Sequence, residues 1–130
     1  MRSLRHRGER GSAVVDFVMV LVVLLPLFAG VLQLALVLHV RNTLSSAAAE
    51  GARYAAVAGS SPQAGVAKAR EQVVGALSPD YARDIRVEPV SIGGAPAYQL
   101  TIDAHVPTLG LGGIAIEFSV SGNAIREEVP

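Results

Sequence analysis

Two side chains of this sequence could form an acid–base pair, Asp103 and His105. They lie two positions apart in a stretch where apolar and polar residues alternate, so an extended strand would place both on one face. A carboxylate beside an imidazole is an arrangement used in general acid–base catalysis. A solvated strand face explains the same spacing without any chemistry, and we prefer that interpretation.

Other signs of a chemical site are weak. The remaining histidines, His6 and His39, lie far from each other and from His105, and the sequence has no cysteine, so no cluster has the spacing of metal ligands. The glycine-rich stretch 109–113 lacks the lysine and the strand-to-helix context of a phosphate-binding loop, so we expect a flexible connector. We therefore predict a protein that is not an enzyme, with no metal, cofactor, small-molecule substrate or nucleic-acid partner.

The carboxylate that most needs explaining is that of Asp16. It directly precedes an apolar run that begins at Phe17, and a charged side chain drawn to the centre of a bilayer costs about 3 kcal/mol on insertion scales. Asp16 could stay at the level of the lipid headgroups near Arg10, or a positive group of a partner could neutralise it. The residues alone leave both alternatives open.

The apolar run extends from Phe17 to Leu38 and predicts a transmembrane helix. At about 1.5 Å per residue it would be about 33 Å long, which exceeds a hydrocarbon core of about 30 Å. Pro26 within the run is compatible with a membrane helix. A buried helix of a soluble domain would normally be shorter. A conventional secretory signal with a cleavage site at the small residues 47–49 would also have a shorter apolar core.

The flanking charges predict the orientation of the span. Four arginines precede it, at positions 2, 5, 7 and 10, whereas Arg41 alone follows closely. Positive charge is retained on the cytoplasmic side. We expect a single-pass protein of the cytoplasmic (inner) membrane, with the N-terminus in the cytoplasm and the C-terminal domain outside it.

The rest of the sequence predicts one small α+β domain outside the membrane. The chain has 130 residues, a formal net charge of zero and 51% hydrophobic residues, which leaves room for one such domain, held together by packing because cysteine is absent. We assign residues 1–11 to a leader, 12–58 to the span and its helical extension, and 59–130 to the outer domain. The C-terminal residues 126–128 are expected to be a solvated tail.

Periodicity predicts the elements of the outer domain. The first helix should continue to Ala58, and a second should follow from Pro62 to Leu77 with Ser61 as its N-cap. Alternating patterns then predict three antiparallel strands near residues 85–89, 98–105 and 114–120, joined by a hairpin at Gly93–Gly94 and a glycine-rich loop. Small residues should line one face of the first helix: Leu44, Ala48, Gly51, Ala52 and Ala55.

The N-terminal residues resemble a known family. Gly11 followed by Ser12, with Asp16 as the fifth residue after the glycine, resembles the cleavage site of type IV prepilins. Together with the later segments, it is similar to the TadE-like pilus assembly proteins of the tight adherence (Tad/Flp) system. The segments that carry the resemblance are 10–17, Pro26, 40–44, the block Glu50, Gly51, Arg53 and Tyr54 within 47–57, and 121–127.

The resemblance implies a function in filament assembly. A prepilin peptidase would cut between Gly11 and Ser12, Asp16 would serve subunit register or peptidase recognition, and the span Phe17–Leu38 would be anchor and assembly core. The expected partners are the peptidase, other pilin-like subunits, the pilus assembly platform and the lipid bilayer. The sequence departs from the family in carrying aspartate where glutamate is usual, and a small polar residue at position 12. The alternative is an uncleaved, membrane-anchored extracytoplasmic binding module.

Overall fold

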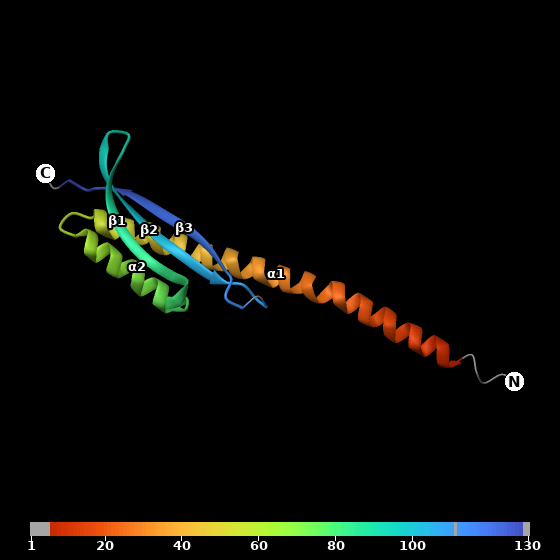
Figure 1. The fold of residues 1–130 in the computed structure, drawn as a ribbon. Helices are drawn as coiled ribbons and strands as arrows, with labels where there is room; N and C mark the ends of the chain where they lie inside the picture. Colours follow the sequence, from red (N-terminus) through yellow and green to blue (C-terminus); the bar gives the residue numbers. More distant parts are fainter. Residues whose placement is uncertain (1–5, 111, 129–130) are drawn as a thin grey trace. The chain divides into compact units, whose positions relative to one another are not determined.

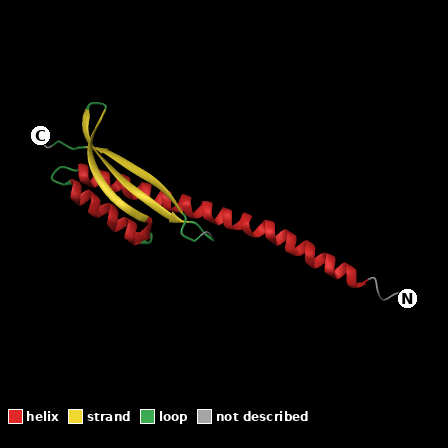
Figure 2. Ribbon diagram, viewed as in Figure 1, coloured by secondary structure: helices red, strands yellow, loops and turns green. Residues whose placement is uncertain are grey.

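The computed structural model describes residues 6–110 and 112–128 (Figure 1). Two helices are followed by a short 3-10 helix and a three-stranded sheet, as coloured in Figure 2. The strands are antiparallel and neighbours in sequence are neighbours in the sheet, in the order β1-β2-β3. The predicted α+β class is confirmed. The elements are α1 (His6–Ala56), α2 (Pro62–Ala76), η1 (Pro79–Tyr81), β1 (Ala82–Ile92), β2 (Ala95–Pro107) and β3 (Ala115–Ile125).

The chain divides into two compact units, residues 1–35 and 36–130. In the first unit, the described residues form the N-terminal part of α1, which begins at His6 and therefore includes the end of the expected leader. Its large apolar side chains from Val14 to Leu34 are exposed, apart from Leu21, which is partly exposed. This part of α1 is long and apolar enough to cross a membrane. Water would not stabilise such a surface, whereas a bilayer would.

The second unit contains the hydrophobic core. The C-terminal part of α1 and the whole of α2 lie against one face of the sheet (Figure 1). The stripe of small residues predicted on α1 is buried there, and Leu44, Ala48 and Ala52 have no exposed surface. The core residues are Val40, Leu44, Ala47, Ala48 and Ala52 from α1, Ala69 and Val73 from α2, and Leu100, Ile102, Ala104, Val106 and Val120 from the sheet.

Two glycines let the helices approach each other closely. A Cβ atom added to Gly51 of α1 would lie 2.8 Å from the carbonyl oxygen of Gly65 in α2, and one added to Gly65 would lie 2.5 Å from the carbonyl oxygen of Gly51. The helix backbones therefore meet where both residues lack a side chain. The second helix begins as predicted, because the Ser61 hydroxyl accepts a hydrogen bond from the Ala64 N–H (3.2 Å) and Pro62 occupies the first turn.

The sheet has one apolar and one polar face. Along β2, Leu100, Ile102 and Ala104 are buried against the helices, whereas Asp103 and His105 point to the opposite side. The predicted alternation is thus confirmed. Gly93 and Gly94 join β1 to β2 with φ values of +59° and +84°, the left-handed conformation that a two-residue hairpin turn of this kind requires. An irregularity in the β1–β2 register between Ala82 and Asp84 leaves Arg83 as an extra residue.

Several bounds differ from the predictions. The first helix ends at Ala56 rather than Ala58, and all three strands are longer than the ranges predicted from the alternating residues. The second helix ends at Ala76 rather than Leu77, and the Leu77 N–H still donates to the Val73 carbonyl (2.8 Å). A single turn of 3-10 helix, Pro79–Tyr81, connects α2 to the sheet. The differences at the two helix ends are one or two residues, within the usual ambiguity of helix ends.

Candidate functional site

The predicted cleavage site lies on an exposed part of α1. Gly11, Ser12 and Asp16 are all exposed, and a Cβ atom added to Gly11 would meet nothing within 4 Å. Asp16 forms no ion pair with any residue in the described ranges. Ser12 and Asp16 are four residues apart in a helix and therefore share a face. A peptidase or a neighbouring helix can reach this face without displacing other parts of the chain's first unit.

The predicted span continues directly from Asp16 within α1. Pro26 lies inside the helix, where its ring nitrogen cannot donate to the carbonyl of residue 22. Phe17 is 63% exposed, and Leu38, at the other end of the span, is 49% exposed. Both ends of the predicted anchor thus present apolar surface that suits lipid or other apolar helices.

The block at residues 50–54 divides into inward and outward side chains. Gly51 is buried at the contact between α1 and α2, and the Glu50 carboxylate accepts a hydrogen bond from the Gln72 side chain of α2. Arg53 and Tyr54 are exposed. Gly51 and Glu50 therefore position α2, whereas Arg53 and Tyr54 remain available to partners.

The segment after β3 is exposed, as expected for a tail, but it also contacts the end of α1. The Glu127 N–H donates to the Ala56 carbonyl at the C-terminus of α1 (2.8 Å), and the Glu127 carboxylate accepts from the Ala58 N–H (3.4 Å). The Arg126 guanidinium lies 5.2 Å from the centre of the Tyr98 ring. The backbone contact satisfies a carbonyl that the C-terminal end of a helix leaves without an intrahelical partner, and the carboxylate pairs with the Ala58 N–H just after the helix. The resemblance at residues 121–127 was the only signal in the sequence for this role.

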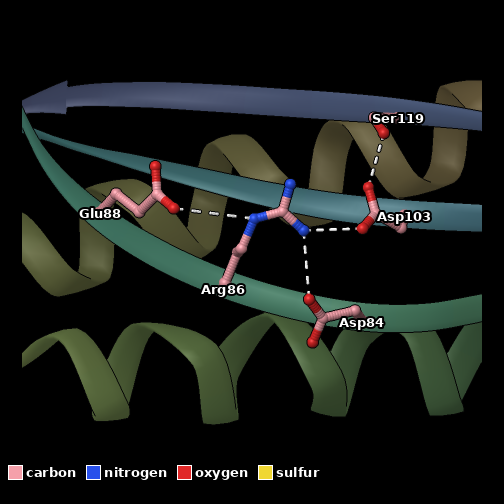
Figure 3. A network of polar contacts seen from close by, with 5 residues as sticks. All are labelled: Asp84, Arg86, Glu88, Asp103 and Ser119. Carbon is pink, nitrogen blue, oxygen red and sulfur yellow. Dashed lines mark hydrogen bonds and ion pairs between the residues drawn. The ribbon is translucent and has the colours of Figure 1, made fainter.

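The polar face of the sheet carries a charged network (Figure 3). The Arg86 guanidinium of β1 lies 2.7 Å from Asp103, 3.1 Å from Asp84 and 3.8 Å from Glu88, and the Ser119 hydroxyl donates to Asp103 at 2.5 Å. The hydrogen bond from Ser119, followed by that from Arg86, lowers the pKa of Asp103. The hydrogen bond to Asp103, followed by that to Asp84, raises the pKa of Arg86. The network links all three strands.

In the structure, the side chains of Asp103 and His105 bind different partners and not each other. They share the polar face as predicted, but the His105 ring lies 3.3 Å from Arg83 and 3.4 Å from Glu117, whereas Asp103 binds Arg86 and Ser119. Each side chain contacts residues on neighbouring strands rather than the other. Within residues 6–110 and 112–128, no group of three histidine or acidic side chains could hold a metal ion. This arrangement fits the solvated strand face better than an acid–base pair.

A comparison with protein families identifies the N-terminal part of the chain. Residues 11–53 match the TadE-like proteins. The resemblance seen in the sequence is thus confirmed over these residues. No curated protein and no solved structure gives a significant match to the chain.

The TadE-like segment begins at Gly11 and ends at Arg53. It includes Ser12, Asp16, the apolar run and the block that contacts α2, all of which belong to α1. The second helix and the three strands follow the segment. The TadE-like match suggests a role in assembly of Tad/Flp pili.

Proposed function

We propose that this protein is a minor prepilin or pseudopilin for an adhesive Tad/Flp-type pilus or a related secretion filament. A prepilin peptidase cuts it after Gly11, and the span Phe17–Leu38 holds it in the cytoplasmic membrane with the C-terminal domain outside. The observation that carries the proposal is the TadE-like match, which starts at Gly11. The same residue is the one after which the spacing to Asp16 predicts cleavage.

The chemistry of the cleaved end gives Asp16 its role. Cleavage creates a positive amine on Ser12, which lies one helical turn from the Asp16 carboxylate. In a bundle of such helices, the carboxylate of one subunit pairs with the amine of the next. Leaving either charge unpaired in an apolar bundle costs several kcal/mol. The pair therefore favours one axial position of each subunit relative to the next. The partners in this assembly are the pilin-like subunits and the assembly platform.

Intact mass tests the cleavage. The full chain is expressed with and without its prepilin peptidase and extracted from membranes. We expect the mass of residues 1–11 to be lost only when the peptidase is present, and the Gly11→Ala variant to stay uncut. Gly30→Ala is the matched control, because it makes the same change within α1 at a position where an added Cβ atom also meets nothing within 4 Å.

An unshortened wild-type chain beside an active peptidase would contradict the proposal. That outcome would favour the alternative, an uncleaved membrane-anchored module. For such a module, the exposed charged face of the sheet around Arg86 would be the binding surface. Cleavage of Gly11→Ala at the wild-type rate would instead show that the peptidase recognises another site.

A further inference from the structure

The connection between β2 and β3 exposes an unusual amount of apolar surface. Leu109 is 49% exposed and Ile114 is 58% exposed, and Ile116 at the start of β3 is 37% exposed. From residue 106 to residue 116 the sequence contains no charged side chain. Connections that face water are usually polar, so an apolar connection such as this one is suited to contact with a membrane or another apolar surface.

The described residues at the two ends of the connection are held together by hydrogen bonds. Both the backbone N–H and the hydroxyl of Thr108 donate to the Ile114 carbonyl, at 3.1 and 2.9 Å. Gly110 and Gly113 have φ values of +84° and +85°. The ends of the connection are therefore held together, and Leu109 beside the Thr108 end is half exposed.

Contacts within the second unit determine which end of the sheet carries this connection. The Arg126 backbone N–H donates to the Pro96 carbonyl (2.9 Å), and the backbone N–H of the next residue, Glu127, donates to the Ala56 carbonyl. The strand β2 therefore begins beside the C-terminal end of α1. Further along β2, Leu100 lies against Gly51. The strand therefore runs along α1 toward lower residue numbers. Figure 1 shows the β2–β3 connection at the end of the sheet opposite the β1–β2 hairpin.

The level of the connection along α1 follows from the rise per residue. The six residues from Leu100 to Val106 cover about 20 Å of strand, which equals about 13 residues of helix. Counted back from Gly51, Val106 is level with about residue 38. The core agrees, because Val106 is fully buried in the cluster that contains Val40 and against which Leu36 and Val37 pack.

We propose that the β2–β3 connection inserts Leu109 and Ile114 into the outer leaflet of the membrane. The helical residues at its level are the last apolar residues of the span, before Arg41. A loop at this level that lacks charge and exposes leucine and isoleucine meets acyl chains and the headgroup boundary. This inference rests on the proposed membrane anchoring.

Site-specific fluorescence tests the insertion. The chain has no cysteine, so Leu109→Cys can be labelled alone with an environment-sensitive fluorophore. The full chain is reconstituted at low density in phosphatidylcholine–phosphatidylglycerol vesicles that contain lipids with a nitroxide on the acyl chain. We expect nitroxide quenching at position 109 to be several-fold stronger than at Ser91→Cys, which lies beside the opposite hairpin. Iodide, an aqueous quencher, should show the reverse order.

Two further variants separate the possible outcomes. A label at Val23→Cys within the span reports membrane anchoring itself. Strong lipid quenching at 23 with strong iodide quenching at 109 would overturn the loop insertion alone. Absence of lipid quenching at both positions would overturn the anchoring as well. A label at 109 that is protected from both quenchers would be covered by protein, which also overturns the proposal.

A charge in the loop provides a second readout. Ile114→Asp should reduce nitroxide quenching of a label at position 109 several-fold, because a carboxylate resists insertion. Ile92→Asp, at the other end of the sheet, is the matched control and should leave the quenching unchanged; Ile92 is also partly exposed. Unchanged quenching in Ile114→Asp would contradict the insertion, provided that circular dichroism shows both variants to be folded.

Discussion

Asp103 joins the three strands through a single side chain. Its carboxylate lies on β2, accepts from Arg86 on β1 and accepts from Ser119 on β3. Asp103 lies outside the TadE-like segment, which ends at Arg53. Because its hydrogen bonds cross to both neighbouring strands, Asp103 contributes to the stability of the sheet, and that contribution depends on its ionisation.

The pH dependence of this contribution has a definite sign. Because the native pKa of Asp103 is lowered, the charged form is favoured by folding. The stabilisation is present above the carboxyl pKa of the unfolded chain, about 4, and is lost as the pH falls through the lower native value. In thermal unfolding of the full chain in detergent, wild type should lose more stability between neutral pH and about pH 3 than Asp103→Asn does.

The control for this prediction is Asp80→Asn, which removes an exposed carboxylate outside the network. It should keep the steeper wild-type pH dependence. The effect of Asp103 should be small, because Arg86 and Asp103 are both partly exposed to solvent. Equal slopes for wild type and Asp103→Asn would show that the network does not stabilise the sheet.

At the scale of elements, the contact between α1 and α2 depends on small residues. A Cβ atom on Gly51 would lie 2.6 Å from the Leu100 side chain and 2.9 Å from the Ala69 Cβ atom, in addition to the Gly65 backbone. Backbone atoms cannot rotate away as the end of a long side chain can. The two helices and β2 therefore share one tightly packed point.

Gly51→Ala should destabilise the second unit by about 1–3 kcal/mol, the usual cost of overpacking a core. Gly75→Ala is the matched control, because Gly75 is an exposed residue of α2 with nothing within 4 Å of an added Cβ atom. It should stabilise the helix by about 0.5–1 kcal/mol. Both changes can be measured by thermal unfolding of the full chain in detergent. A neutral Gly51→Ala would show that the helices separate at little cost.

The sequence predicted the elements better than their contacts. Ser61 and Pro62 are local signals, and the alternation around Leu100 is a local pattern, so both were predictable. The role of Gly51 was foreseen only in part: the stripe placed it on a packed face, but its partner Gly65 is distant in sequence. For the same reason the sequence placed Asp103 and His105 on one face but did not predict that each would contact other strands.

At the scale of the whole molecule, the segment after β3 returns to the end of α1. Glu127 contacts Ala56 and Ala58, and no local pattern predicts such a pairing across the length of the domain. Its backbone N–H donates to the Ala56 carbonyl, and its carboxylate accepts from the Ala58 N–H. The contact between the C-terminal segment and the end of α1 is therefore long-range in sequence and depends on Glu127.

Glu127→Ala should increase amide hydrogen exchange at Ala58 several-fold while leaving the exchange of core strand β2 unchanged, because only the carboxylate is removed. Hydrogen–deuterium exchange measured by mass spectrometry on the full chain in detergent would test this. Glu128→Ala is the control and should not change exchange at Ala58. Exchange at Ala58 as slow as in wild type would show that the carboxylate contact is not maintained in solution.

The position of β3 in the chain has a consequence for biogenesis. Gly122 of β3 packs directly on the backbone of Ala48 and Ala49, so the alanine-rich stripe of α1 lacks part of its cover until β3 has emerged. A chain threaded across a membrane from its N-terminal side delivers that stripe first and its cover last. In the proposed topology the stripe stays partly uncovered during this interval, and the domain closes only after β3 has been delivered.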